Sequence, residues 1–465
     1  MLCGWPAGAA ARTQTQTQEL PGVVAAAFKR AGIPPSAVGS FVQEVGSVAP
    51  VVAVNTTTPF NPASTMKLLT TDAALELLGP TFTWKTQAYA NGLQDGEVLQ
   101  GDLVIRGSGD PKLVIENFWL FLRQIRARGI RDIRGDLLLD RSAFAVATHN
   151  AAQFDGEPLK SYNAGPDALL LNYKSFGMRF VPDLAHGNVN VVLDPPLAGY
   201  KVVAPILTDG ECDDWQGRLR ANIQGDGASF DGVFPLSCGE QSWHVLPYTM
   251  TDTQYFDAVF RQMWRDLGGS LSGEVREGVT PPAASLITEW QSPTLPEVIR
   301  DINKYSNNVM ARQLLLTLAS GQPQLPATSE RAAQVIRTWL ADKHIDAPDL
   351  VIENGSGLSR TERIAAGTMG RMLVAAFRGP TMPEFMSSLP LVGYDGTMRR
   401  RLKDQGVAGY AHIKTGTLRE VRALAGYVLA ASGRRYVVVN LINHANAARG
   451  QEAQDLLLEW IYEHG

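Results

Sequence analysis

Apolar residues recur with helical spacing near both ends of the chain and with strand-like spacing over much of its middle. Near the N-terminus, residues 19–33 predict a helix and residues 41–54 predict a broken pair of strands. A turn-rich segment at 57–62 leads into an apolar run that stops at Gly79-Pro80. That run predicts a helix with a Gly/Pro stop, which begins close to Ser64.

The middle of the chain, from residue 81 to about 282, has short strand-like segments separated by Gly, Pro and Asp. One helix is predicted within it, at 113–128. Helical periodicity returns after Pro281-Pro282, and a helix is predicted at 295–305. The chain then closes with three predicted strands and a helix, at 409–414, 424–431, 436–442 and 447–463.

Strand-forming segments at both ends therefore enclose a helical region, which favours one domain built from the two ends of the chain. The predicted fold is mixed α and β, with an antiparallel sheet flanked by helices and a large β-rich insertion of one or two further domains. By residue number, we expect a leader or tether at 1–18, the helix-and-sheet domain at 19–83 and 288–465, and the insertion at 84–287.

Composition and charge exclude several classes of protein. The 465 residues are 45% hydrophobic and 19% charged, which predicts a folded globular chain. A formal net charge of -4 offers no basic excess for nucleic acid, and we expect no nucleic-acid partner. No apolar run approaches the roughly 18 residues of a membrane span. Cys3 lies in the leader, whereas Cys212 and Cys238 are consistent equally with one disulfide and with two buried free thiols.

Three short motifs carry the candidate chemistry, and they occur in a fixed order along the chain. They are Ser64-Thr65-Met66-Lys67, Ser306-Asn307-Asn308 and Lys414-Thr415-Gly416-Thr417. Each motif alone is weak evidence for a catalytic site. Ser161-Tyr162-Asn163 is a second Ser-x-Asn copy, and we set it aside because it lies within the insertion. Together the three match the S-x-x-K, S-x-N and K-T-G signature of penicillin-binding proteins and β-lactamases.

The first motif predicts a nucleophile and its base. In the first turn of a helix, residues i and i+3 share a face, so Ser64 Oγ and Lys67 Nζ can come within hydrogen-bonding distance. Lys67 can accept a proton only when neutral, so its pKa must fall, and burial together with a second cation at Lys414 would lower it.

The other two motifs predict groups that complete a cleft. Ser306 would relay a proton toward the leaving nitrogen, and Asn308 would hold Lys67 and the substrate peptide group. Lys414 with Thr415 or Thr417 would bind a terminal carboxylate, while Gly416 permits close approach of a ligand to the strand. The backbone N–H groups of Ser64 and Thr417 would form the oxyanion hole. His412 is predicted to be structural.

The chain resembles the class C low-molecular-mass penicillin-binding proteins, the type 4 D-Ala-D-Ala carboxypeptidase/endopeptidases of the S13 peptidase group. Besides the three motifs, the resemblance rests on Gly107-Ser108-Gly109-Asp110-Pro111-Lys112-Leu113, Ser161-Tyr162-Asn163-Ala164, Gly355-Ser356-Gly357-Leu358-Ser359-Arg360, Asp395-Gly396-Thr397-Met398 and Ala423-Leu424-Ala425-Gly426-Tyr427.

The resemblance implies a transpeptidase/β-lactamase-like domain and a Ser64 acyl-enzyme that cleaves peptidoglycan stem peptides and cross-links. It implies acylation by β-lactam antibiotics, no metal, no cofactor and an exported, periplasmic location. It also favours a disulfide between Cys212 and Cys238. A peripheral contact with the membrane is compatible with it, and the oligomeric state stays open.

The resemblance carries over less directly at two places. Relatives use an insertion residue near the cleft to meet the stem-peptide amino group. Asp155 and Glu157 both lie in this stretch, and Asp155 is kept as the substrate-binding candidate. Glu420-Val421-Arg422 places charge where relatives often have small residues, so the substrate side-chain pocket is expected to differ.

Two alternative functions are weighed against this interpretation. One is a β-lactamase or esterase on the same fold, which would need a separate deacylation base that the sequence does not display. The other is a non-catalytic β-lactam-binding or wall-binding module, which the intact Ser64, Lys67 and Lys414 disfavour. Other catalytic motifs, such as Gly-x-Ser-x-Gly and His-Glu-x-x-His, are absent from the sequence.

Overall fold

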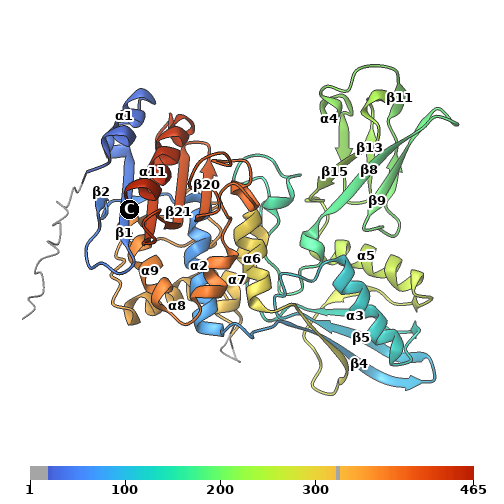
Figure 1. Ribbon diagram of the computed structural model, residues 1–465. Helices are drawn as coiled ribbons and strands as arrows, with labels where there is room; N and C mark the ends of the chain where they lie inside the picture. Colours follow the sequence, from blue (N-terminus) through green and yellow to red (C-terminus); the bar gives the residue numbers. More distant parts are fainter. Residues whose placement is uncertain (1–18, 321–324) are drawn as a thin grey trace, which may run out of the picture.

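A computed structural model describes residues 19–320 and 325–465. The predicted leader at 1–18 lies outside the described residues. In the described part the protein is elongated, with a helix-and-sheet body at one end and β-rich layers at the other (Figure 1). It is a mixed α and β structure, as the sequence predicts.

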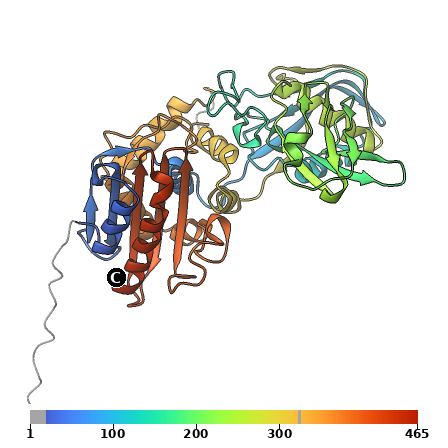
Figure 2. The same ribbon diagram turned by 90° about the horizontal axis from the view of Figure 1, so that it is seen from above.

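The body is organised around a five-stranded antiparallel sheet of order β2-β1-β22-β21-β20. Figure 2 shows that strands from the two ends of the chain lie side by side in it. Register pairs Phe41 of β1 with Val439 of β22, so residues about four hundred positions apart are direct neighbours. Its strands are β1 (Val38–Glu44), β2 (Val52–Val54), β20 (Ala411–Leu418), β21 (Val421–Leu429) and β22 (Arg435–Asn443).

Helices cover both faces of this sheet because its central strands are apolar on both sides. Val437, Val439 and Leu441 of β22 join one buried cluster, while Val438 and Ile442 join another on the opposite face. On the second face lie α1 (Gly22–Arg30) and α11 (Gln451–His464). The first face is covered by α2 (Met66–Leu78), α6 (Leu295–Tyr305), α7 (Asn308–Leu318), α8 (Ser329–Asp342), α9 (Ala366–Arg378) and α10 (Met382–Ser388).

The β-rich part contains two groups of strands over a separate core. One mixed sheet consists of β4 (Lys85–Asp95), β5 (Val98–Arg106), β6 (Asp132–Ile133), β7 (Leu137–Asp140), β16 (Ser270–Leu271), β17 (Val275–Glu277) and β18 (Ser285–Gln291). The second group consists of β8 (Phe176–Asp183), β9 (Asn188–Asp194), β10 (Lys201–Val203), β11 (Ile206–Thr208), β12 (Ala221–Ile223), β13 (Gly227–Phe230), β14 (Val233–Pro235) and β15 (Gln241–Val245). In this second group Cys212 and Cys238 form a disulfide, with Cα atoms 4.8 Å apart.

Two details differ from the sequence predictions. The insertion holds a second long helix, α5 (Asp252–Asp266), besides α3 (Ile115–Ala127). Its signal is the capping box of Thr251 and Gln254, followed by buried residues at helical spacing, several of them aromatic. In addition, β18 continues to Gln291, beyond the predicted boundary at 287/288, and the domain boundaries stay a prediction.

Asp72 is a buried acid in α2 with no hydrogen-bond partner for either carboxylate oxygen among the described residues. Burial, together with the nearby Glu76, raises the pKa of Asp72 well above its ordinary value. An acid whose pKa is raised by folding favours the folded state at low pH and loses that advantage as the pH rises.

We therefore expect wild-type protein to lose stability relative to the Asp72→Asn variant as the pH rises from about 4 toward the folded pKa of Asp72. The expected slope is about 1.4 kcal/mol per pH unit. Urea unfolding of both proteins at several pH values measures it. Asp404→Asn, at a side chain 82% exposed, is the control. A constant difference between Asp72→Asn and wild type across this range would contradict the prediction.

Candidate active site

The structure brings together all three predicted motifs at the edge of the sheet beside the start of α2. Ser64 lies in a short 3-10 turn, Ala63–Thr65, that runs directly into α2. Asn61 braces this turn: its side-chain oxygen accepts from the Ala63 N–H at 2.9 Å, and its backbone pairs with the Asn443 side chain at the end of β22. The segment that carries Ser64 is thereby fixed to the C-terminal part of the sheet.

Backbone strain occurs at two positions of this site. Ala63, directly before Ser64, has a φ of 45°, and Ser306, at the C-terminus of α6, has a φ of 58°. Non-glycine residues rarely adopt this left-handed region, and they keep it where the surrounding structure holds them there. The strained turns place Ser64 against Lys67 and Ser306 against Lys414.

Lys67 is completely buried, and its ammonium contacts three polar groups. Its Nζ lies 3.1 Å from Ser64 Oγ and 2.6 Å from Asn308 Oδ1, and it also donates to the Ser356 carbonyl oxygen. Burial is the main cause that lowers the pKa of Lys67 well below its ordinary value, and the charge of Lys414 lowers it further. A lysine of this kind can be neutral, and a neutral amine can take the proton of Ser64.

Lys414 is the second buried ammonium of the site. Its Nζ donates to Ser306 Oγ and to the Thr415 carbonyl oxygen, both at 2.9 Å. Burial lowers the pKa of Lys414 to about 7. No carboxylate lies within ion-pair distance of this ammonium among the described residues, so it is available for an anion from outside.

The third motif lies on β20, the edge strand of the five-stranded sheet. On the outer edge of β20, Leu391 pairs with His412 near the start of the strand. From Lys414 onward, no strand of the described residues pairs with this edge. Thr397 braces the motif through a 2.9 Å contact between its hydroxyl and that of Thr415. An exposed edge of this kind can accept an extended peptide as an added strand.

Gly416 allows β20 to touch the turn that carries Ser64. A Cβ atom at this position would lie 2.8 Å from the Pro62 carbonyl oxygen and 3.0 Å from the Ser64 nitrogen. Side chains larger than hydrogen would push the strand away from the turn. The motif therefore needs glycine here to keep Thr417, which is exposed, beside Ser64.

The loop 353–358 completes the site, and no role for it follows from the three motifs. It is held by Glu362, a fully buried carboxylate that accepts the backbone N–H groups of residues 353, 354, 355 and 357 at 2.8–3.1 Å. Burial raises the pKa of Glu362. Gly357, with a φ of 78°, packs against the Ala63 carbonyl oxygen, where any Cβ would clash. These four hydrogen bonds from the loop to Glu362, which we call the Glu362 clamp, place the Ser356 carbonyl oxygen where it accepts from Lys67 Nζ.

Asp155 and its neighbours lie at the far end of this cleft, on an exposed part of the insertion. Its carboxylate accepts from the Tyr162 hydroxyl at 2.8 Å and from the Asn163 amide at 2.9 Å. The adjacent Phe154 packs with Ala63, Leu418, Val421 and Leu358 at the end of β20. The Ser161-Tyr162-Asn163 copy therefore supports Asp155 and makes no contact with Lys67.

Two sequence-based details change in the structure. The apolar pattern predicts a helix that begins at Val309, with Ser306 and Asn308 on the linker before it. In the structure Asn308 is the first residue of α7, and Asn307 caps that helix by accepting from the Met310 N–H. Arg422 turns its guanidinium to the carbonyl oxygens of Leu418 and Val421, at 3.0 Å each. Its charge thus braces the turn after the third motif, a contact that depends on tertiary geometry.

The described residues contain no group of three or more His, Cys, Asp or Glu side chains that could hold a metal ion. Within the same ranges, every helix is too short or too polar to cross a bilayer.

Comparison with known proteins gives consistent matches over nearly the whole chain. Residues 22–463 match the model of the D-Ala-D-Ala carboxypeptidase 3 (S13) family. The chain is 26% identical to D-alanyl-D-alanine carboxypeptidase DacB of Haemophilus influenzae, over 88% of this chain and 85% of that protein. It is 31% identical to carboxypeptidase DacB of Mycolicibacterium smegmatis, over 86% of this chain and 74% of that protein.

The fold is also that of a solved structure. The crystal structure of penicillin-binding protein 4 (dacB) from Haemophilus influenzae superposes with a TM-score of 0.78 at 22% identity, covering 95% of this chain and 99% of that one. A second structure of the same protein, complexed with a β-lactam, superposes with a TM-score of 0.75.

The electrostatic effect of Lys414 on Lys67 generates a pH prediction. Lys67 accepts a proton only when neutral, so reaction at Ser64 should slow as the pH falls through the pKa of Lys67. Removing the neighbouring charge by Lys414→Gln should raise that pKa and move the acidic limb upward by about one pH unit. The rate of acylation by a penicillin, followed from pH 5 to 10, measures it; an unmoved limb would count against the coupling. Lys403→Gln, at an exposed lysine, is the control.

The Glu362 clamp generates a second prediction. Glu362→Gln should slow acylation by about tenfold. The amide nitrogen cannot accept a backbone N–H, so the loop is no longer held and the Ser356 carbonyl oxygen moves away from Lys67 Nζ. Glu353→Gln is the matched control, since the Glu353 carboxylate binds only the hydroxyls of Ser359 and Thr361. Equal rates in the two variants would show that Glu362 supports stability alone.

Proposed function

The chain belongs to the D-Ala-D-Ala carboxypeptidase 3 (S13) family, and from this premise we propose that Ser64 is the nucleophile with which it hydrolyses peptidoglycan stem peptides. It is a serine-type D-Ala-D-Ala carboxypeptidase, and β-lactams are its covalent inhibitors. The observation that carries the residue assignment is the contact of Ser64 Oγ with the buried, pKa-lowered Lys67.

Acylation begins when neutral Lys67 takes the proton of Ser64 and Oγ attacks the carbonyl carbon of the penultimate D-Ala. Negative charge then develops on the carbonyl oxygen, and the backbone N–H groups of Ser64 and Thr417 are the proposed donors to it. Cleavage of the C–N bond releases the terminal D-Ala, whose nitrogen receives a proton from Ser306. The Lys414 ammonium, 2.9 Å from Ser306 Oγ, can replace that proton.

Hydrolysis of the acyl-enzyme completes the cycle. Proton exchange with solvent first returns Lys67 to its neutral form and Lys414 to its ammonium form. A water molecule then gives one proton to Lys67 and attacks the ester carbon, and the Ser64 oxygen takes that proton back from Lys67 as the peptide carboxylic acid is released. A β-lactam follows the first half of this sequence, with its ring amide in place of the scissile bond.

Substrate orientation follows from the edge of β20. An extended peptide laid along it would carry its terminal carboxylate toward Lys414, with the hydroxyls of Thr415 and Thr417 as further donors. Asp155 is the proposed partner of the stem-peptide amino group, supported by its exposed carboxylate close to Phe154 at the end of the strand. The same orientation accommodates a cross-linked stem peptide, for which the enzyme would act as a DD-endopeptidase.

Peptidoglycan as substrate implies an exported protein, and we propose a periplasmic location with peripheral membrane association. The domain assignment goes with it: residues 19–83 and 288–465 as the catalytic domain and 84–287 as the insertion.

The Ser64→Ala variant tests the assignment. It should lose covalent labelling by a fluorescent penicillin and lower D-Ala release from a stem pentapeptide by at least about a thousandfold, because no other hydroxyl occupies that position. Circular dichroism and thermal unfolding should match wild type. Ser161→Ala, in the second Ser-x-Asn copy, is the control and should keep both activities. Persistent labelling of the Ser64→Ala variant would refute the nucleophile.

A further inference from the structure

An ion pair links the second motif to the third, and no step of the proposed mechanism uses it. Lys304, two residues before Ser306, contacts Asp395 with 2.6 Å between Nζ and Oδ2. We propose that Asp395, through this pair, is a positioning residue that holds Ser306 where it can protonate the leaving nitrogen. This inference rests on the proposed function, in which Ser306 is the proton donor. We call the contact the Lys304–Asp395 pair.

The Asp395 carboxylate binds two separate parts of the site at once. One oxygen accepts from Lys304 on the last turn of α6, and the other accepts from the Leu391 N–H at 2.7 Å. Leu391 in turn pairs with His412 of β20, two residues before Lys414. The carboxylate therefore ties the end of α6 to the stretch of β20 that leads into the third motif.

The turn that follows Asp395 packs between the same two elements. This short 3-10 turn, η6 (Gly396–Met398), contacts both α6 and β20. A Cβ atom on Gly396 would lie 2.6 Å from the Lys304 carbonyl oxygen, so the turn is in close contact with the end of α6. The side chain and the backbone of Lys304 are thus both held by the segment that begins at Asp395.

Ser306 needs such support because its backbone is strained. It directly follows α6 with φ 58° and ψ 38°, a conformation that a non-glycine residue keeps only where its neighbours hold it. Lys304 is only 5% exposed, so loss of Asp395 would leave a buried ammonium without a counter-ion. The end of α6 would then shift to bring that charge to water, and Ser306 would shift with it. A proton donor displaced from hydrogen-bonding distance transfers its proton more slowly.

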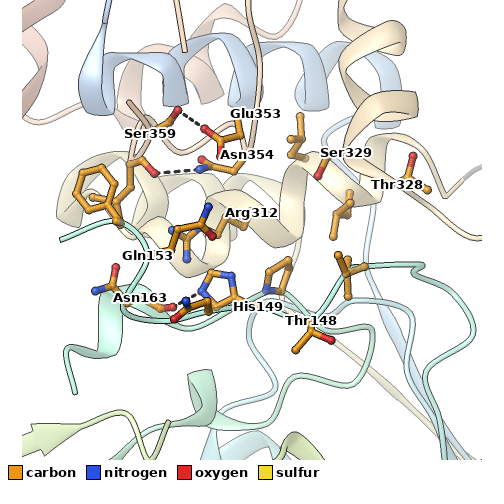
Figure 3. A pocket seen from close by; sticks show the side chains of 18 of the residues that line it. Thr148, His149, Gln153, Asn163, Arg312, Thr328, Ser329, Glu353, Asn354 and Ser359 are labelled. Carbon is orange, nitrogen blue, oxygen red and sulfur yellow. Dashed lines mark hydrogen bonds between the residues drawn. The ribbon is translucent and has the colours of Figure 1, made fainter. Parts of the chain in front are cut away.

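The Lys304–Asp395 pair has no direct contact with the reacting groups. In the described part of the chain, the Asp395 carboxylate hydrogen-bonds to Lys304 and Leu391 and to none of Ser64, Lys67 and Lys414. A cavity of about 600 Å³ lies between the insertion segment 145–154, α7 and the segment 353–361 (Figure 3), and neither Lys304 nor Asp395 lines it. Any effect of the pair on the rate must therefore pass through Ser306 or β20.

Two substrates that differ in their leaving group test this role. One is a stem peptide that ends in D-Ala-D-Ala, and the other is the matching thioester that ends in D-Ala-D-thiolactate. An amide nitrogen must receive a proton in order to leave, whereas a thiolate leaves without one. Asp395→Asn should therefore lower kcat/KM about tenfold more for the amide than for the thioester. Because both substrates are measured on one protein sample, any loss of folded protein cancels from this ratio.

A second variant tests the pair itself. Lys304→Met should change the amide-to-thioester ratio as Asp395→Asn does, because either change removes the same ion pair. The double variant should cost no more than either single variant. Additive effects of the two substitutions on the ratio would overturn the role of the pair.

Asp301→Asn is the matched control. Asp301 lies on the same helix, α6, and its carboxylate pairs with Lys112 of the insertion, also at 2.6 Å. Its substitution removes an equivalent ion pair from α6 and leaves the contact with the β20 side in place. The amide-to-thioester ratio should stay at the wild-type value. A change as large as that of Asp395→Asn would show that any weakening of α6 has this effect, and would overturn the inference.

The Ser306→Ala background shows whether Asp395 acts through Ser306. Ser306→Ala should lower the ratio at least as far as Asp395→Asn, and adding Asp395→Asn to it should lower the ratio no further. A further fall, or an equal loss for amide and thioester in Asp395→Asn alone, would overturn the positioning role and leave the proposed function intact. Absence of turnover of both substrates by wild type, together with absence of penicillin labelling, would overturn the proposed function itself.

Discussion

Two buried ammonium groups, each hydrogen-bonded to a different serine hydroxyl, are the constraint on which the rest of this structure depends. Lys67 and Lys414 are both fully buried, and neither has a carboxylate at its side. Burial of a charge without a counter-ion costs several kcal/mol, roughly, in a folded protein. Hydrogen bonds to Asn308, Ser306 and backbone carbonyls offset part of that cost. The lowered pKa values of the two lysines also make loss of a proton from either ammonium easier. The instability of the charged form is what would equip Lys67 for the proposed role of base.

The scaffold explains how such an arrangement persists. Ser64 is tied to the C-terminal sheet through Asn61 and Asn443, and β20 contacts the Ser64 turn where Gly416 has no side chain. On the opposite side, Glu362 gathers four backbone N–H groups and so fixes the loop that reaches Lys67. Support from the sheet, helix and loop holds Ser64 on Lys67 and Ser306 on Lys414 at hydrogen-bonding distances, which the proposed proton transfers require.

The insertion gives the cleft its length. Its own core is separate from that of the helix-and-sheet body, yet its segment 145–163 reaches back to α7 and to the end of β20. The catalytic groups alone would recognise a short D-Ala-D-Ala terminus or a β-lactam. Additional walls from the insertion offer contacts to a longer peptide, and binding energy collected there can be used to orient the scissile bond.

The sequence by itself determined the main elements at the two ends of the chain and the three motifs, because hydrophobic periodicity, turn residues and short-range spacing are local properties. Ser64 and Lys67 could be paired for the same reason, since one helical turn joins them. Tertiary structure alone decided the contacts that join distant parts of the chain: Ser306 with Lys414, Ser356 with Lys67, and Arg312 with the Ala164 carbonyl. Nothing local marks Glu362 as part of the site, because its signal is the set of four backbone N–H groups around a buried carboxylate, which exists only once the chain has folded.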